Sequence, residues 1–278
     1  LSVEGNHLDG LKNGHWKWYN STGEKYMEGD FLDGMQDNLW TYYFENGQIE
    51  ATGKFEKDLR QGEWKMYYKD GSKWQIGSYQ DDRKDGHWQV YFESGQLLQE
   101  GEYKLGKEDG EWSSWYQNGE PKDWGNYKGG IMHGDWKGWY DNGNSNYTGI
   151  RKDGEKTGHW TFGYANGKVR EEGDYSEGLK NGPWKYFYES GKIDYECSYL
   201  LGAKNGKCVY YYAHGSKMRQ ESYQKDRLSG KSLMWGPQEN LLSERNFKNG
   251  LPHGKVIDYD DKGEKISESV FKNGERIK

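Results

Sequence analysis

Length, composition and charge narrow the classes of protein to which this chain can belong. With 278 residues it suits one large domain or two ordinary ones, and its 14 Trp, 41 Gly and 17% aromatic content exclude a disordered chain and predict a core of aromatic rings packed against glycine. The 45 acidic and 39 basic residues leave a net charge of −6 without a basic block, and no stretch approaches about 18 apolar residues, so we expect no nucleic-acid partner and no membrane-spanning helix.

The N-terminal segment predicts a strand that lacks one of its neighbours. The chain opens with Leu1 and has no Met or basic and apolar leader at its start, so we expect a trimmed or mature piece. Residues 2–7 resemble the second strand of a hairpin, and we interpret their edge as one that pairs with more chain, another copy or a different protein. Repeated head-to-tail pairing of copies would build a filament.

A strict 24-residue repeat then runs along the chain. A glycine recurs at Gly14 and at each further step of 24 residues as far as Gly254, with Asn38 as the only substitute. Two residues later stands a tryptophan, in the column Trp16, Trp40, Trp64, Trp88, Trp112, Trp136, Trp160 and Trp184, which then changes to Cys208, Ser232 and Val256. Because nothing is inserted or deleted between copies, every copy predicts the same local structure.

Each copy of the repeat predicts one β-hairpin. An aromatic pair such as Tyr43-Phe44 leads into Asn46-Gly47, and Asn-Gly between β-prone runs is the strongest hairpin signal, since a type I′ turn needs positive φ at both central residues. The second connection, such as residues 104–109, is charged and predicts a longer loop that joins one hairpin to the next.

These elements predict an all-β fold, an elongated single-layer twisted antiparallel sheet of stacked β-hairpins with a 24-residue repeat and about eleven repeats. We expect residues 1–278 to form a single domain, with regular Trp/Gly repeats at 1–192 and divergent C-terminal repeats at 193–278.

The repeat also predicts a ladder in which each tryptophan lies opposite glycine. A two-residue turn at Asn46-Gly47 places Trp40 opposite Gly53, and centring the second connection places Trp40 opposite Gly29 as well. A ring that covers a glycine strengthens a strand which the glycine alone would weaken. The glycine column ends where the tryptophan column ends, which favours this pairing; its members are Gly29, Gly53, Gly77, Gly101, Gly125, Gly149 and Gly173.

Strand alternation leaves one aromatic residue per repeat on the opposite, polar side of the sheet. This aromatic row consists of Tyr19, Tyr43, Tyr67, Tyr91, Trp115, Trp139, Phe187, Tyr211, Trp235 and Tyr259. Two interpretations stay open. Sheet twist folds these rings over their neighbours as secondary packing, or the rings form a binding stripe.

Cys197 and Cys208 replace one glycine and tryptophan pair of the ladder, and the register places them opposite each other. They predict either a disulfide or a reduced pair that fills the same volume. Together with the glycosylation triplets at residues 20–22 and 146–148, a disulfide favours an extracytoplasmic location (secreted, periplasmic or cell surface), with a cytoplasmic one as the alternative.

No motif for catalysis, a cofactor or a metal emerges from the repeat. His15, His87 and His159 share one column but lie three repeats apart, roughly 30 Å, too far to ligate one zinc ion. There is no nucleophile elbow, phosphate-binding loop or zincin motif, and the glycines belong to the repeat. We therefore expect no catalytic residues, no cofactor and no enzyme activity.

The repeat resembles a known family, the bacterial variant of the MORN repeat found in proteins labelled YwqK-type antitoxin-like. Its phrase G-x-W-x-x-Y-Y-x-N-G is almost unaltered in residues 86–95, and the resemblance fades after the eighth repeat. It implies twisted sheets of hairpins that act as scaffolds, dimerising or docking surfaces, with lipid binding in some members. The antitoxin label implies a protein partner.

Two hypotheses of function follow. The first is a protein-binding or structural scaffold that also self-associates end to end. The second is binding of a cell-surface carbohydrate through the aromatic row, since rings at regular spacing stack on sugars. Binding to a lipid surface is disfavoured by the negative charge.

Overall fold

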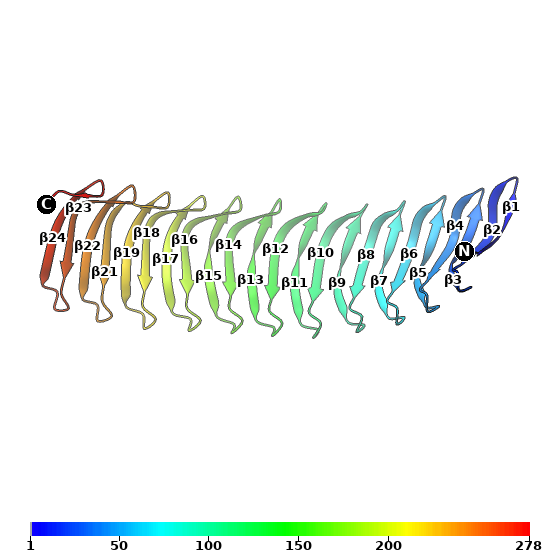
Figure 1. Ribbon diagram of the computed structural model, residues 1–278, viewed down its shortest axis with the longest axis horizontal. Coiled ribbons are helices and arrows are strands. Elements are labelled where there is room, and N and C mark those ends of the chain that lie inside the picture. The colour runs from blue at the N-terminus through cyan, green and yellow to red at the C-terminus, as the bar shows by residue number, and fades with distance from the viewer. Residues whose placement is uncertain (1) are drawn as a thin grey trace. The chain divides into compact units, whose positions relative to one another are not determined.

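The computed structural model describes residues 2–278, and its contacts divide the chain into two compact units, Leu1–Gly134 and Asp135–Lys278. Both units consist of β-strands joined by turns, and residues 2–278 contain no helix (Figure 1). Paired strands run antiparallel and follow each other along the chain. The predicted all-β hairpin fold is confirmed, whereas a single domain over residues 1–278 stays a prediction.

The first unit contains β1 (Ser2–Leu8), β2 (Leu11–Tyr19), β3 (Lys25–Leu32), β4 (Met35–Tyr43), β5 (Ile49–Glu56), β6 (Leu59–Tyr67), β7 (Lys73–Gln80), β8 (Arg83–Tyr91), β9 (Leu97–Lys104), β10 (Lys107–Trp115) and β11 (Pro121–Lys128), and β12 (Ile131–Trp139) crosses the boundary. The second unit contains β13 (Ser145–Lys152), β14 (Glu155–Gly163), β15 (Val169–Ser176), β16 (Leu179–Phe187), β17 (Ile193–Leu200), β18 (Ala203–Tyr211), β19 (Lys217–Gln224), β20 (Arg227–Leu228), β21 (Gly230–Trp235), β22 (Leu241–Lys248), β23 (Leu251–Tyr259), β24 (Lys265–Lys272) and β25 (Glu275–Arg276).

The tight turn of each repeat lies at the connection for which the sequence predicted a longer loop. Leu32 pairs directly with Met35, and the two residues between them, Asp33 and Gly34, have φ of 50° and 82°. Positive φ at both central residues is the mark of a type I′ turn, whose twist matches that of the strands. The predicted long charged loop is therefore wrong, because its outer residues continue the strands.

The Asn-Gly connection is the wider of the two turns, so the predicted two-residue turn at Asn46-Gly47 is also wrong. The amide of Gly47 donates to the carbonyl of Phe44 at 2.9 Å, and the amide of Phe44 donates to the carbonyl of Gln48 at 2.8 Å, which encloses a three-residue loop. Only Gly47 has positive φ there, at 80°. Tyr43, and not Phe44, therefore pairs with Ile49.

The register of the ladder is nevertheless the predicted one. A shift between Tyr42 and Tyr43 restores it, so that Trp40 pairs with Gly53 on one side and with Gly29 on the other. The indole does not cover the two glycines equally. A Cβ on Gly29 would overlap the ring of Trp40, whereas one on Gly53 would overlap the ring of Trp64. Each indole thus lies over the glycine of the preceding strand.

A bulge beside each tryptophan explains this asymmetry and the recurring glycine two residues earlier. The ladder between β3 and β4 passes from Trp40 to Asp37, which leaves Asn38 and Leu39 as a bulge. Asn38 has φ of 57°, and the glycines of this column also have positive φ. Asparagine tolerates that conformation best after glycine, which explains the single substitution. The carbonyl of Asp30 accepts the indole N–H of Trp40 at 3.1 Å.

The core of each unit is one layer of interlocked aromatic rings on the tryptophan side of the sheet, which we call the indole face. In the first unit the rings alternate in edge-to-face contact along Phe31, Trp40, Phe55, Trp64, Tyr79, Trp88, Tyr103 and Trp112. In the second unit Tyr175 lies between Trp160 and Trp184 in the same way. Each such pair contributes about 0.5–1.5 kcal/mol beyond burial, and Trp40, Trp88, Trp160 and Trp184 are at most 1% exposed.

The last repeats keep the hairpin while losing the ladder. Ser229 interrupts one strand and separates β20 from β21. In the turn column, Glu239 replaces glycine and has φ of 66°, a left-handed conformation that costs a non-glycine residue about 1 kcal/mol. The turn hydrogen bond from the amide of Glu239 to the carbonyl of Gly236 is kept at 2.9 Å.

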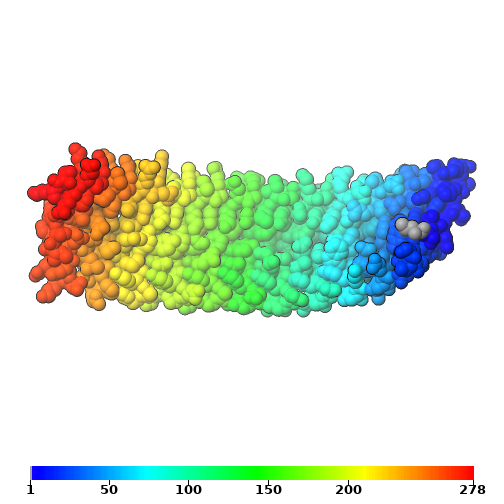
Figure 2. Space-filling model, viewed as in Figure 1, coloured from blue at the N-terminus to red at the C-terminus, as the bar shows by residue number. Residues whose placement is uncertain are grey.

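Within each unit, the main contacts of every strand are with strands adjacent in sequence. The surface accordingly runs in successive bands of neighbouring sequence, as the colours of Figure 2 show. Both faces of the sheet therefore belong to the surface. Over residues 2–278 we find no helix of the length and apolarity needed to cross a membrane.

Candidate functional site

The aromatic row lies on the face opposite the indole rings, which we call the polar face. All ten of its members are half-buried. Their rings therefore neither stand free in solvent nor lie in the core. The structure places the row as predicted by strand alternation, and its role in binding stays a prediction.

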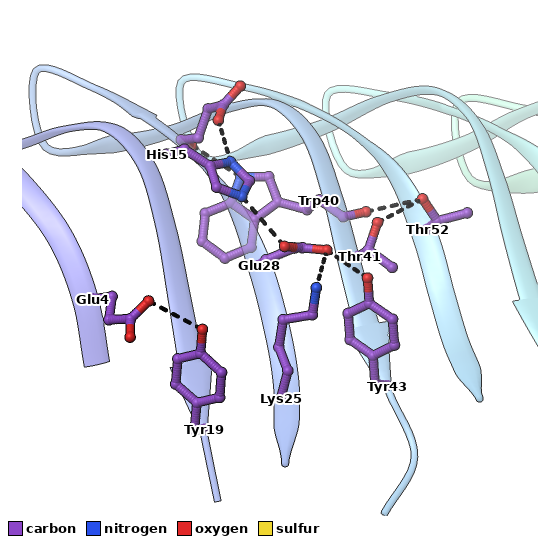
Figure 3. A network of polar contacts seen from close by, with 10 residues as sticks. Glu4, His15, Tyr19, Lys25, Glu28, Trp40, Thr41, Tyr43 and Thr52 are labelled. Carbon is purple, nitrogen blue, oxygen red and sulfur yellow. Dashed lines mark hydrogen bonds and ion pairs between the residues drawn. The ribbon is translucent and has the colours of Figure 1, made fainter. Parts of the chain in front are cut away.

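Several phenols of the row donate to glutamates on the preceding hairpin strand. Tyr19 bonds to Glu4 at 3.1 Å, Tyr211 to Glu196 at 3.0 Å, and Tyr43 to Glu28 (Figure 3). Burial and the bond to Glu196 raise the pKa of Tyr211 to about 12, so this phenol stays protonated and continues to donate. These bonds tie together, on the polar face, the two strands that a type I′ turn joins.

Glu28 is the centre of the most connected of these networks (Figure 3). Lys25 lies 2.6 Å from one carboxylate oxygen, and Nε2 of His15 lies 3.3 Å from the other. Burial alone would raise the pKa of Glu28, but the hydrogen bonds from Lys25, Tyr43 and His15 together hold it at about 2. The ammonium of Lys25 also lies 4.7 Å from the ring centre of Tyr43.

Two members of the row flank a cleft in the second unit. Its lining consists of Tyr211, Trp235, Gly215, Ser216, Lys217 and Glu239, and its volume is about 380 Å³. Two rings one repeat apart therefore line the same cleft as the hydroxyl of Ser216, the ammonium of Lys217 and the carboxylate of Glu239. A smaller hollow of about 160 Å³ lies beside the two cysteines and is lined by Pro183, Trp184, Lys185, Glu196, Cys197, Ser198, Lys207 and Val209.

The repeat that builds these faces matches a known family. A model of the MORN repeat variant matches residues 36–57, 60–81, 84–105, 132–153, 156–177 and 180–200. The chain carries MORN repeats of this variant family. The matched segments lie in both units and each contains one indole of the ladder, so the MORN repeat and the indole ladder are the same structural unit.

Comparisons with curated proteins and with solved structures give no further information on the function of the chain. No curated protein matches the chain. Among solved structures, the chain aligns with a Tc holotoxin pore of Photorhabdus luminescens at 14% identity and a TM-score of 0.22, over 92% of this chain and 14% of that one. It aligns with a TcdB2-TccC3 crystal structure at 10% identity and a TM-score of 0.20, over 95% of this chain and 18% of that one. The chain thus covers less than a fifth of either structure, and TM-scores this low do not indicate a shared fold.

A row of cations lies over the indole face of these MORN repeats, and we did not predict it from the sequence. The ammonium of Lys84 lies 4.0 Å from the ring centre of Trp88, and that of Lys180 lies 3.9 Å from that of Trp184. Burial lowers the pKa of Lys84 and of Lys156. The signal was present in the sequence as a basic residue four positions before the tryptophan, at Lys12, Arg60, Lys84, Lys156 and Lys180.

The two cysteines and the histidine column occupy defined places in the MORN repeats. Cys197 pairs with Cys208 in the ladder, and a disulfide joins them. His15 lies between Asp30 and Glu28, and His87 lies between Glu102 and Glu100 in the same manner. Residues 2–278 bring together no group of histidine, cysteine and carboxylate side chains suited to hold a metal ion.

Proposed function

We propose that this chain is a non-enzymatic, protein-binding or structural scaffold built from MORN repeats. The observation that carries the proposal is that within each unit a hairpin packs mainly on its sequence neighbours, so that both sheet faces stay at the surface. Side chains then recur along each face at the period of the repeat, an arrangement typical of proteins that offer long recognition surfaces. The YwqK-type label and end-to-end self-association are part of the proposal.

A partner search with matched variants tests it. The full chain serves as bait beside a variant with Tyr67→Ala and Tyr91→Ala in the aromatic row, and beside a control with Glu63→Ala and Glu111→Ala, which are exposed on the same face. We expect a partner or a second copy to bind the full chain and the control and to be lost with the row variant. An inert monomer by mass photometry, without any specific partner, would refute the scaffold.

An extracytoplasmic location is the second part of the proposal. The Cys197–Cys208 disulfide supports it, since disulfides persist in oxidising compartments and are rare in the cytosol. Trapping of thiols in intact cells with an alkylating reagent tests the location. Two alkylated cysteines in the native protein would place the chain in a reducing compartment.

Carbohydrate binding is the second candidate function, and the cleft between Tyr211 and Trp235 favours it. Rings stack on sugar faces, while Lys217, Ser216 and Glu239 offer hydrogen-bond partners to hydroxyl groups. We expect the tryptophan fluorescence to change when cell-surface glycans are added, and Trp235→Ala to abolish the change. The absence of binding to any glycan on a glycan array would refute carbohydrate binding.

A further inference from the structure

Exposed apolar side chains gather where the type I′ turns of the first three hairpins meet the polar face. Leu8 pairs with Leu11, Leu32 pairs with Met35, and Leu59 occupies the same position beside the third turn. These five residues, which we call the N-terminal apolar edge, are 37–59% exposed. Contiguous exposed apolar side chains on a folded domain mark interaction sites.

The edge is held rigidly by contacts between consecutive turns. The amide of Gly34 donates to the carbonyl of Lys12 at 2.9 Å, and the amide of Asp58 donates to the carbonyl of Gln36 at 3.0 Å. The side chain of Leu11 lies over the next turn, where a Cβ on Gly34 would be 3.5 Å from its Cδ2. The apolar residues of successive hairpins therefore form one ridge that is already ordered before a partner arrives.

The fold does not require apolar residues at these positions. In the next two hairpins of the same unit, the equivalent pairs are Gln80 with Arg83 and Lys104 with Lys107. The same turns form there with charged and polar side chains. Exposed apolar side chains return at this position in some later hairpins, at Ile131, Leu179, Leu200 and Leu251. Among the described residues, only residues 8–59 carry them in three consecutive hairpins, so this uninterrupted run is not a requirement of the fold.

The charge around the edge indicates the sign of its partner. Residues 1–60 carry eleven acidic and six basic residues, which accounts for most of the net charge of −6. Asp9, Asp33 and Asp58 lie in the turns themselves, where Lys57 is the one basic residue, and Asp30 pairs with Asp37 one step further along the strands. An acidic rim around apolar side chains repels anionic lipid and attracts a cationic partner.

The spacing of the edge favours a helix over an extended segment. Neighbouring strands lie about 4.8 Å apart, and side chains on one face of an extended chain recur about every 6.7 Å. A helix advances about 5.4 Å per turn, so apolar residues at i, i+3 or i+4, and i+7 meet successive strands of the edge.

We propose that the N-terminal apolar edge docks a basic amphipathic helix of a partner protein. The apolar stripe of that helix covers Leu8, Leu11, Leu32, Met35 and Leu59, and its flanking Lys and Arg face the aspartates of the turns. This inference rests on the proposed scaffold function and names the surface and the chemistry of one partner.

Fluorescence anisotropy with a labelled peptide of about 20 residues, Leu at heptad positions and Lys elsewhere, tests the inference on the full chain. The edge variant carries Leu11→Asn and Met35→Gln. The matched control carries Arg83→Gln and Lys107→Gln at the same positions of later hairpins. We expect the edge variant to bind at least tenfold more weakly than the wild type and the control to bind at least as tightly, with circular dichroism unchanged in both.

A charge variant and two further probes complete the test. Asp9→Asn with Asp33→Asn keeps residues that tolerate positive φ in the turns, and we expect weaker binding with a flatter salt dependence. Equal binding of a scrambled peptide, or equal binding by the edge variant, overturns the inference. Capture by anionic vesicles that only the edge variant loses would assign the edge to lipid instead. Loss of a natural partner through the aromatic row, with no peptide bound at the edge, would leave the scaffold standing and remove this inference alone.

Discussion

Adding a single methyl group to the indole ladder is expected to destabilise the protein more than its size suggests. Gly53→Ala would place a Cβ within 3.0 Å of three indole atoms of Trp64, whereas carbons in contact lie about 3.5–4.0 Å apart. The ring must therefore retreat by roughly 1 Å or more. Trp64 is 3% exposed, so it has no free space on that side.

The magnitude follows from the contacts that the displaced ring loses. Overpacking costs about 1–3 kcal/mol, the hydrogen bond from the indole to the carbonyl of Lys54 is worth about 1 kcal/mol, and the edge-to-face contact with Phe55 about 1 kcal/mol. Alanine regains about 0.5–1 kcal/mol over glycine in a strand. We expect a net loss of about 3 kcal/mol in the free energy of unfolding.

Urea unfolding followed by circular dichroism measures the loss, with two controls. Lys54→Ala changes the next residue, which is exposed on the other face, and should shift stability by less than about 0.5 kcal/mol. In a Trp64→Leu background, Gly53→Ala should cost almost nothing. An equal penalty in both backgrounds, or one no larger than that of Lys54→Ala, would refute the steric reasoning.

Three further substitutions should change the stability of the protein, each for a different physical reason. Glu239→Gly should raise stability by about 1 kcal/mol in a urea titration, because glycine adopts positive φ without strain, and a loss of stability would contradict this. Replacement of both Cys197 and Cys208 by serine should lower stability by about 3 kcal/mol, since the bond closes a loop between residues separated by 11 positions, and dithiothreitol should have no effect on that variant. The pKa of Glu28 is about 2 in the folded chain, against an ordinary value of 4.5. Its contribution to stability is therefore complete above pH 4.5 and is lost as the pH falls towards 2. Glu28→Gln should reduce the acid-induced fall of the urea midpoint over that range, and an unchanged fall would show that the network of Glu28 does not form.

The fold could be predicted from the sequence because each 24-residue repeat specifies its own strand pairing through contacts between residues close in the chain. Trp40, Gly29 and Gly53 recur without insertions, and two-residue alternation along a strand places all three on one face whatever surrounds them. The same argument brought the two cysteines opposite each other. Pairing within a hairpin needs only short-range geometry, so the repeated pattern was sufficient.

The turns show where the pattern was ambiguous. Asn46-Gly47 carries the sequence signal of a type I′ turn, but the turn of that type lies at Asp33-Gly34. The register was still right, because the extra residue of the wider loop is compensated by the shift at Tyr43. Backbone dihedrals depend on how strand ends meet, and residue type alone does not distinguish a type I′ turn from a three-residue loop ending in glycine.

The candidate surfaces were decided by tertiary packing. The sequence marked the aromatic row, but only the structure shows that Tyr43 donates to Glu28 on the adjacent strand and that the rings are half-buried. The basic residue four positions before the tryptophan was visible in the sequence, but only the structure places the ammonium of Lys84 over the ring of Trp88 and brings Leu11 and Met35 into one exposed ridge. The ridge of Leu11 and Met35 joins two hairpins and exists only after they stack. The contacts of Tyr43 and Lys84 lie within one hairpin or one strand, but they depend on side-chain conformation and on burial by the neighbouring strands, which the repeat pattern does not specify.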